Sequence, residues 1–226
     1  MYVPTYYAEA DLPTLFDFIE QHLFGLLISQ QDGVPVATHL PFLLDRAAGE
    51  RGVLFAHVAR QNPQWKDFAD QQVLAIFHGP HTYVSPAWYQ AEKVVPTWNY
   101  VAVHAYGRVK LIEDLDETIA LVRELTDRFE RSRPDPWTFD PSAPFVRKMA
   151  SQIVAFRIEI ERIEGKWKLN QNHPEDRRRR VIDRLREQGG ENSEAIASLM
   201  AGMLAGPKDK PRPLQPSPQA DLGDTS

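Results

Sequence analysis

Strand-like segments follow one another along most of this chain, and most of the intervals between them are too short for a crossover helix. The clearest segment has two alternating sets of residues: Val154, Phe156, Ile158 and Ile160 against Ala155, Arg157, Glu159 and Glu161. Alternation with a period of two predicts a strand with one buried face. Because parallel strands need long crossovers, the pattern favours an antiparallel barrel or sandwich with outer helices. The predicted fold is α+β, mainly β, and built on a β-barrel.

The first third of the chain predicts a helix followed by a hairpin. Apolar residues recur at helical spacing over residues 12–23, and residues 24–28 form a short apolar run typical of a buried strand. Asp32 and Gly33 then predict a tight turn before a second strand over residues 34–44. A third strand is expected over residues 53–58. Asn62 and Pro63 resemble the cap and first residue of a short helix, with Trp65, Phe68 and Ala69 facing inward.

Further along, strands are expected over residues 73–77, 98–112 and 154–161, which makes six strands in all. Asp114 and Glu117 form a capping-box pattern for a helix over residues 115–129, and residues 145–150 predict a helical turn. Two more helices are expected before Gly206, the first ended by Gly189 and Gly190. We therefore predict a barrel domain over residues 1–172, a helical extension over residues 173–205 and a disordered tail over residues 206–226.

Composition narrows the possible functions. The 226 residues include no cysteine, which excludes disulfides and thiolate chemistry and favours a cytoplasmic location. No apolar run reaches the roughly 20 residues of a membrane helix, and the histidines have no metal-site spacing, so neither membrane insertion nor a structural metal is expected. The net charge of −5 gives no general attraction to nucleic acid. The single basic cluster, Arg177 to Arg180, is flanked by acids, which favours a solvated helix face over a DNA contact.

Residues 57–63 (HVARQNP) connect a strand to a predicted helix start, where free backbone N–H groups favour an anion. Arg60 adds a guanidinium that can bind phosphate through two parallel hydrogen bonds. A phosphate-binding turn is therefore one interpretation, and an ordinary capped connection is the other. In the second strand, Thr38 and His39 interrupt an apolar run, so they face either a ligand ring or neighbouring backbone.

Two other stretches combine polar and aromatic residues. Lys168, Gln171 and Asn172 follow the alternating strand and bring a charge and two amides to its end, which suits an anion or a heterocycle edge as well as a plain surface turn. Residues 79–100 are rich in aromatic rings, proline and glycine. Rings of this kind stack on flat ligands, although cores and subunit interfaces use them more often.

Five motifs together resemble the PaiB family of FMN-binding negative transcriptional regulators: residues 37–41 (ATHLP), 59–65 (ARQNPQW), 79–86 (GPHTYVSP), 95–100 (VPTWNY) and 166–172 (KWKLNQN). They occur in one register between residue 1 and about residue 185. Asn170 departs from the pattern, since the family is expected to have serine there. The resemblance implies a split β-barrel related to pyridoxamine-phosphate oxidases and flavin reductases, and a homodimer with flavin sites between subunits.

On the same basis, the resemblance assigns the cofactor FMN to three groups of residues. Val36, Ala37, Thr38 and His39 would lie beside the flavin ring; Arg60, Gln61 and Asn62 would form the phosphate side; and Lys168, Gln171 and Asn172 would close the site. His57 is a further expected cofactor-binding residue. Repression of transcription is the implied output. The alternatives are a flavin-dependent oxidoreductase of the split-barrel type and, ranked last, a haem-binding or haem-degrading barrel with His39, His57 or His81 as axial ligand.

Overall fold

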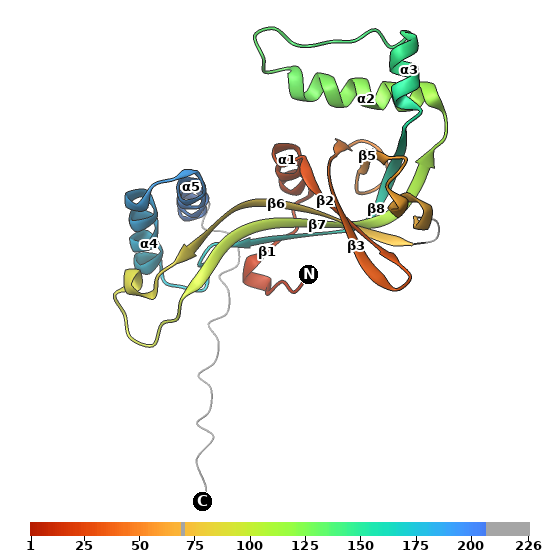
Figure 1. The fold of residues 1–226 in the computed structure, drawn as a ribbon. Helices are drawn as coiled ribbons and strands as arrows, with labels where there is room; N and C mark the ends of the chain where they lie inside the picture. Colours follow the sequence, from red (N-terminus) through yellow and green to blue (C-terminus); the bar gives the residue numbers. More distant parts are fainter. Residues whose placement is uncertain (69–70, 207–226) are drawn as a thin grey trace, which may run out of the picture. The chain divides into compact units, whose positions relative to one another are not determined.

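A computed structural model describes residues 1–68 and 71–206 of the chain (Figure 1). It divides into two compact units. Unit 1 comprises residues 1–2, 8–79 and 100–167, and unit 2 comprises residues 3–7, 80–99 and 168 onward. Three long strands, β6 (Gln72–Val84), β7 (Thr97–Ile112) and β8 (Ile153–Lys168), contribute residues to both units. The predicted tail lies outside the described residues, apart from Gly206.

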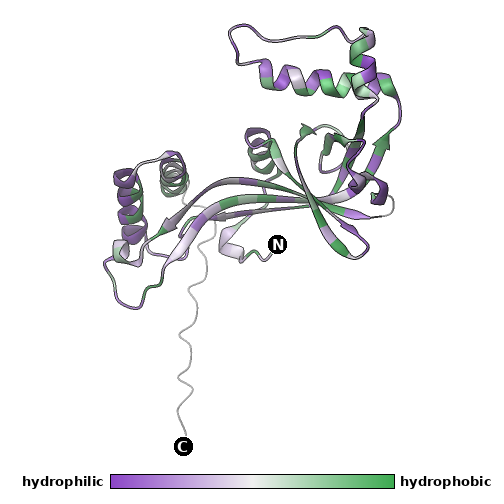
Figure 2. Cartoon of the chain, in the orientation of Figure 1, coloured by the Kyte–Doolittle hydropathy of each residue, from purple (hydrophilic) through white to green (hydrophobic). Residues whose placement is uncertain are grey.

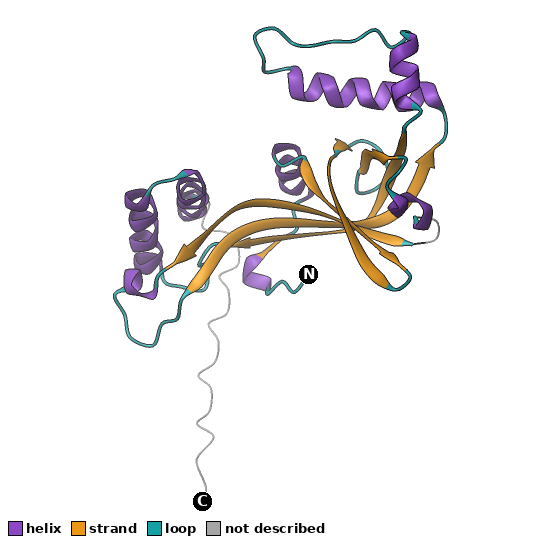
Figure 3. Ribbon diagram, viewed as in Figure 1, coloured by secondary structure: helices purple, strands orange, loops and turns teal. Residues whose placement is uncertain are grey.

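The remaining strands are short and mostly precede β6: β1 (Ala8–Glu9), β2 (Phe24–Gln31), β3 (Val34–Pro41), β4 (Leu43–Asp45) and β5 (Val53–Ala59). Within the described residues, the short and long strands together form one sheet in the order β3-β2-β6-β7-β8-β5-β4, with β1 paired to β8 (Figure 3). The pairs β1–β8, β2–β3, β2–β6, β4–β5 and β5–β8 are all antiparallel. The α+β, mainly β prediction is confirmed. The strand count of six was too low, because the two-residue β1 was not predicted and the strand predicted over residues 34–44 is divided into β3 and β4.

The β2–β3 hairpin forms where the sequence predicts it. Asp32 and Gly33 form the turn with φ values of 50° and 78°, and such positive values at both central positions are typical of tight hairpins. The expected strand over residues 34–44 is divided, because Phe42 interrupts it and its backbone N–H donates to the Leu23 carbonyl 2.9 Å away. β3 also approaches β5, so strands from opposite parts of the sheet order curl toward each other.

The barrel interior follows the alternation of β8. Phe156 and Ile158 are fully buried, and the β5–β8 register sets them opposite Ala56 and Leu54, which are fully buried as well. Phe68 packs edge-on against Phe156 with 5.1 Å between ring centroids. Figure 2 shows apolar residues interspersed with hydrophilic ones along the strands. Burial of the alternate residues, predicted from sequence, is therefore confirmed.

Helix α1 (Leu12–Gln21) begins at Asp11, whose carboxylate accepts the Thr14 backbone N–H. It packs closely on two glycines of the sheet. A Cβ atom on Gly165 would lie 2.3 Å from the Leu15 side chain, and one on Gly79 would lie 2.7 Å from the Phe18 ring. Both positions must lack a side chain for α1 to approach the sheet this closely.

Helix α2 (Leu115–Glu130) begins at Asp114, whose carboxylate accepts the backbone N–H groups of Asp116 and Glu117. It packs through Leu121 and Leu125 against strands β4 and β8. Helix α3 (Pro144–Ala150) follows at the predicted helical turn. Phe129, in the last turn of α2, is 46% exposed although the expected helix over residues 115–129 ends on this apolar residue.

Unit 2 contains helices α4 (Glu175–Gln188) and α5 (Glu191–Ala205), which pack against each other. Short 3-10 helices at Thr5–Tyr7 (η1) and Pro86–Tyr89 (η3) belong to the same unit, and α4 packs on η3. Met200 of α5 accepts a hydrogen bond from the buried Asn99 amide, with 3.4 Å between nitrogen and sulfur. Both helices start and end near the predicted bounds. No helix in the described part of the chain is long and apolar enough to cross a membrane.

Candidate functional site

The turn after β5 is built around Asn62. Its side-chain oxygen accepts the Gln64 backbone N–H at 3.0 Å and caps η2 (Pro63–Asp67), while its amide nitrogen donates to the Thr38 hydroxyl at 3.0 Å. The predicted cap is therefore present. The predicted helix, however, is a five-residue 3-10 helix, which has too few aligned peptide groups for a substantial dipole. The turn offers less attraction to an anion than the sequence suggested.

Gln64 is the buried centre of this region, and the sequence reasoning missed it. Its side-chain oxygen accepts the Thr38 hydroxyl at 2.6 Å, and its amide nitrogen lies 3.0 Å from the Ser29 hydroxyl, 3.2 Å from the Val36 carbonyl and 3.3 Å from the Leu27 carbonyl. Gln64 thus ties η2 to both strands of the first hairpin. Trp65, expected to face inward, is only partly buried, and its indole N–H donates to the Arg60 carbonyl; Ala69 lies outside the described residues.

Arg60 uses one full edge of its guanidinium within the protein. Nε donates to the Ser151 carbonyl at 2.8 Å, and Nη2 donates to the Ile153 carbonyl at 2.9 Å. This is the edge with which arginine grips a phosphate or carboxylate bidentately. Arg60 therefore secures the turn to the start of β8 through Nε and Nη2. Gln61 lies exposed beside it. The assignment of this turn to phosphate stays a prediction.

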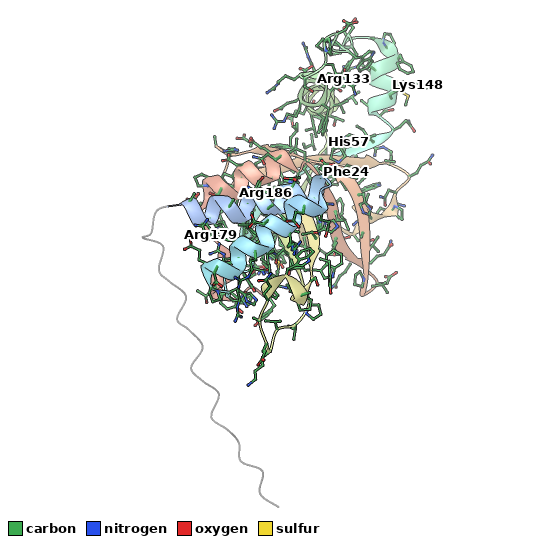
Figure 4. The ribbon with its side chains drawn as sticks, turned by 90° about the vertical axis from the view of Figure 1, so that its left-hand side faces the viewer. Phe24, His57, Arg133, Lys148, Arg179 and Arg186 are labelled. Carbon is green, nitrogen blue, oxygen red and sulfur yellow. The ribbon has the colours of Figure 1, made fainter. Side chains whose placement is uncertain are left out.

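The four predicted residues of β3 divide between the two faces of the sheet. Val36 and Thr38 are half-buried, and Thr38 bonds to Gln64 and Asn62. Ala37 and His39 are exposed on the other face, where His39 stacks on Phe24 with 6.2 Å between ring centroids. Figure 4 labels Phe24, which is 64% exposed. Of this group, Ala37 and His39 are therefore the ones available to a ligand on the outer face.

The outer face around His39 is apolar. The registers place Leu26 and Ile28 of β2 opposite His39 and Ala37 of β3 on one side and opposite Ile76 and Leu74 of β6 on the other. All four of these aliphatic side chains are half-buried in the single chain. We call Leu26, Ile28, Leu74 and Ile76, with Ala37 and His39, the outer β2–β3–β6 face. A sheet face of this composition is suited to cover by a flat ligand or a partner.

His57 lies on β5, where its register partner is Ala155, and is labelled in Figure 4. Its Nδ1 atom is buried without a hydrogen-bond partner. Burial lowers the pKa of His57 below its ordinary value, so the ring is neutral at neutral pH. A neutral, half-buried ring can donate or accept one hydrogen bond with a ligand, but it contributes no positive charge to phosphate binding.

The three remaining predicted residues belong to unit 2. Lys168 ends β8 and donates to the Thr97 hydroxyl at 2.5 Å, and Gln171 accepts the Leu169 backbone N–H at 2.7 Å. Asn172 accepts the Tyr7 hydroxyl at 2.9 Å. The strand therefore delivers these residues to its own end, as the alternation predicts, and their contacts hold the segment in a defined shape.

Asn170, the departure from the family pattern, has a structural role in this segment. Its φ of 62° is in the left-handed region, which asparagine tolerates better than most residues. Its amide donates to the Tyr89 hydroxyl at 2.7 Å, and the Tyr89 ring stacks on His173 with 4.5 Å between centroids. Tyr89 is fully buried, whereas Trp98 and Tyr83 are 53% and 43% exposed. The aromatic stretch thus supplies both core and surface rings.

The donor set fits a flavin nucleotide. The outer β2–β3–β6 face offers aliphatic side chains and a histidine ring to a flat heterocycle. His57 Nδ1, which has no hydrogen-bond partner in the protein, is a polar atom that a ligand could contact. Among the described residues, no group of three or more acidic or histidine side chains could hold a metal ion. The chemistry of these residues therefore suits an organic ring more than a cation.

Residues 1–162 match the family model described as "Putative FMN-binding domain". The chain belongs to this FMN-binding domain family. It is also 34% identical over 206 residues to the Bacillus subtilis (strain 168) protein named "Protease synthase and sporulation protein PAI 2", an alignment that covers 90% of this chain and 98% of the relative. The PaiB resemblance inferred from the five motifs is thereby confirmed.

Two solved structures show the fold of this family member. The FAD and heme binding protein from Mycobacterium smegmatis is similar with a TM-score of 0.57 and 17% identity, over 82% of this chain and 81% of that one. The flavocytochrome Anf3 from Azotobacter vinelandii has the same TM-score and identity, over 74% of this chain and 72% of that one. The fold is the predicted split β-barrel with outer helices and a C-terminal helical extension.

Proposed function

We propose that this chain binds FMN and that the outer β2–β3–β6 face receives the flavin ring. The match to the FMN-binding domain family over residues 1–162 carries this proposal, because that range includes β3 and the turn after β5. His39 and Ala37 face the ring from β3, and the residues around Asn62 hold β3 in place from behind. When bound, FMN supplies electron or hydride transfer at its ring.

Lys168, Gln171 and Asn172 complete the proposed set of flavin contacts, as the motif of residues 166–172 implies. Their side chains offer one ammonium group and two amides, which can bind the polar edge of the flavin ring through both donors and acceptors. Gln61 and His57 supply further polar groups beside β5. These assignments follow the family resemblance residue by residue.

The functional form in this proposal is a homodimer. Leu26, Ile28, Leu74 and Ile76 form an aliphatic sheet face that is only partly buried within the described part of the chain, and a second copy is the partner that would bury it. Flavin sites between subunits, implied by the family, fit the same face. Light scattering tests the dimer: the expected mass is about twice that of one 25.8 kDa chain.

Leu26→Glu places a charge on the proposed interface and is expected to yield monomers, since a buried unpaired carboxylate costs several kcal/mol. Val34→Glu is the matched control, because Val34 is 61% exposed near the hairpin turn. A dimer that persists in Leu26→Glu, or a wild-type chain that is monomeric at micromolar concentration, would contradict this arrangement.

The biological output we propose is control of transcription in the cytoplasm, as the PaiB resemblance implies. Direct contact with DNA gains little support from α4, because three of its arginines pair with acids of the same helix: Arg179 with Glu175, Arg180 with Asp176 and Arg184 with Glu187. A gel-shift titration with the upstream region of its own gene tests direct binding. Binding that strengthens at low salt supports it, and its absence with and without flavin opposes it.

Flavin binding is tested first by the visible spectrum of the purified protein and then by FMN titration. Bound FMN absorbs at about 450 nm, and quenching of its fluorescence gives the dissociation constant. Absence of FMN binding at micromolar concentrations would refute the proposal. Oxidation of NADH or NADPH by the FMN-loaded protein would instead favour the oxidoreductase interpretation, and a Soret band would favour haem.

A further inference from the structure

Lys166 is a buried cation that lacks an anionic partner. Only 8% of the residue is exposed, and within the described part of the chain it forms no ion pair. Its ammonium group donates to the Tyr2 carbonyl at 3.1 Å and lies 5.8 Å from the Tyr2 ring centroid and 5.2 Å from that of Tyr100. An ammonium group carries three N–H donors, so a single neutral acceptor leaves it undersupplied.

The surroundings of Lys166 are positive. We define the β7–β8 cluster as Lys166, Arg162, Glu164, His104 and the Met1 amino group. Glu164 accepts from the Met1 amine at 2.5 Å and also pairs with Arg162. Three cations therefore face one carboxylate, an excess of two positive charges. Because Glu164 is already shared by two cations, its charge is not available to Lys166.

The pKa of His104 reflects this excess of positive charge. Burial is the largest cause that lowers its pKa, and the Met1 amine lowers it next. Arg162 and Lys166 lower it further, whereas Glu164 alone raises it. The His104 Nδ1 atom is buried without a partner, so the cluster contains an unused polar atom as well as an uncompensated charge. Both features suit an anion with several acceptor oxygens.

The competing basic side chains are already engaged. Arg60 donates from the bidentate edge of its guanidinium to the carbonyls of Ser151 and Ile153, and Lys168 donates to the Thr97 hydroxyl. Arg162 also lies over the Tyr106 ring, 3.6 Å from its centroid. Arg60 and Lys168 also donate to neutral acceptors, but Lys166 is the most deeply buried of the three, since Arg60 is exposed and Lys168 is partly buried.

From this arrangement we infer that Lys166 binds the phosphate group of FMN. The inference rests on the proposed flavin binding and moves the phosphate from Arg60 to the β7–β8 cluster. The Tyr2 and Tyr100 rings flank the ammonium group, and a phosphate oxygen supplies the charged acceptor that the folded chain does not. Tyr2 is 83% exposed, so its ring can shift to admit the phosphate without loss of core packing.

The test compares FMN with riboflavin, which lacks the phosphate. Dissociation constants for both are measured by fluorescence quenching on wild type, Lys166→Met, Lys166→Arg and Arg60→Met, with an untagged N-terminus because the Met1 amine belongs to the cluster. Lys166→Met is expected to weaken FMN binding by about tenfold to a hundredfold and to leave riboflavin binding unchanged. Lys166→Arg keeps the charge and is expected to retain most of the preference for FMN.

The contrary results each refute a specific claim. Equal weakening of FMN and riboflavin in Lys166→Met, or no change in either, refutes the phosphate assignment. Selective loss of FMN in Arg60→Met, with Lys166→Met unaffected, returns the phosphate to the turn after β5. Should circular dichroism show that Lys166→Met is unfolded, a Lys166→Arg variant with no preference for FMN gives the same refutation. Failure of wild type to bind either flavin refutes the proposed function itself.

Discussion

The buried amide of Gln64 provides the sharpest test of how the barrel is held together. Gln64→Leu keeps the approximate size of the side chain but removes its hydrogen bonds to Thr38, Ser29 and the carbonyls of Leu27 and Val36. An amide has two N–H donors and one acceptor oxygen in use here, so about three bonds are lost at one time. At about 1 kcal/mol each, with buried partners left unsatisfied, the expected cost is about 2–4 kcal/mol.

Gln64→Glu turns the same position into a pH-dependent one. The site is fully buried, and the carbonyls that received the amide protons would face a carboxylate. Burial raises the pKa of such a glutamate in the folded state above its unfolded value of about 4.3. The added destabilisation is therefore absent below about pH 4.3 and grows as pH rises toward the folded pKa. A two-unit rise corresponds to about 2.7 kcal/mol.

Urea denaturation at fixed protein concentration, at pH 5 and pH 8, measures both effects. Gln64→Leu is expected to lose the same free energy of unfolding at both values of pH, whereas Gln64→Glu loses more at pH 8. Two results would refute the reasoning: a Gln64→Leu midpoint equal to that of wild type, or a Gln64→Glu variant with the same pH dependence as Gln64→Leu.

Three further predictions concern stability. Asn170→Ala loses the bond to Tyr89 and also places a Cβ residue without polar compensation at φ 62°, so urea melts should rank it about 1 kcal/mol below Asn170→Gly, which loses only the bond; equal stabilities would contradict this. Gly165→Ala is expected to cost about 1–3 kcal/mol through the Leu15 contact and to be partly rescued by Leu15→Ala, which additive losses would rule out. Burial pushes the pKa of Glu164 upward, but its bonds to the Met1 amine and Arg162 outweigh burial and lower it. Stability from this pairing is present above pH 4.5 and lost as pH falls through the folded pKa, so acid titration of Glu164→Gln should lack that loss.

Elements stabilised by neighbours in sequence were predictable. The β2–β3 hairpin follows from Asp32 and Gly33, and α2 follows from Asp114, because a turn or a cap acts within a few residues. The end of β6 was not predictable in this way. The strand was predicted over residues 73–77 only, yet it runs to Val84, since Gly79 is required by the approach of Phe18 and not by a turn.

In the candidate site, too, features set by neighbours in sequence were predictable and features set by distant residues were not. The cap at Asn62 was visible in the sequence, but the acceptors of Arg60 lie more than ninety residues further along the chain. Nothing near Arg60 indicates that two carbonyls occupy its guanidinium. Gln64 had a weak signal, because a polar residue beside a capped helix start can face inward, although Trp65 next to it seemed the better core residue on apolar character alone. Lys166 gave no signal of its own, since burial of a lysine depends on strand packing.

The close seating of α1 has a consequence for the divergence of this family. Gly79 and Gly165 leave no room between the sheet and the side chains of Phe18 and Leu15. A homologue that acquires alanine or serine at either glycine must shorten the facing helix residue or shift α1 outward, and at Gly165 it must also relieve contacts of 2.7 Å with Trp167 and 2.9 Å with the Glu9 carbonyl. Substitutions at these four positions are therefore expected to occur together, although the two members of each pair are separated by about sixty and by one hundred and fifty residues of chain.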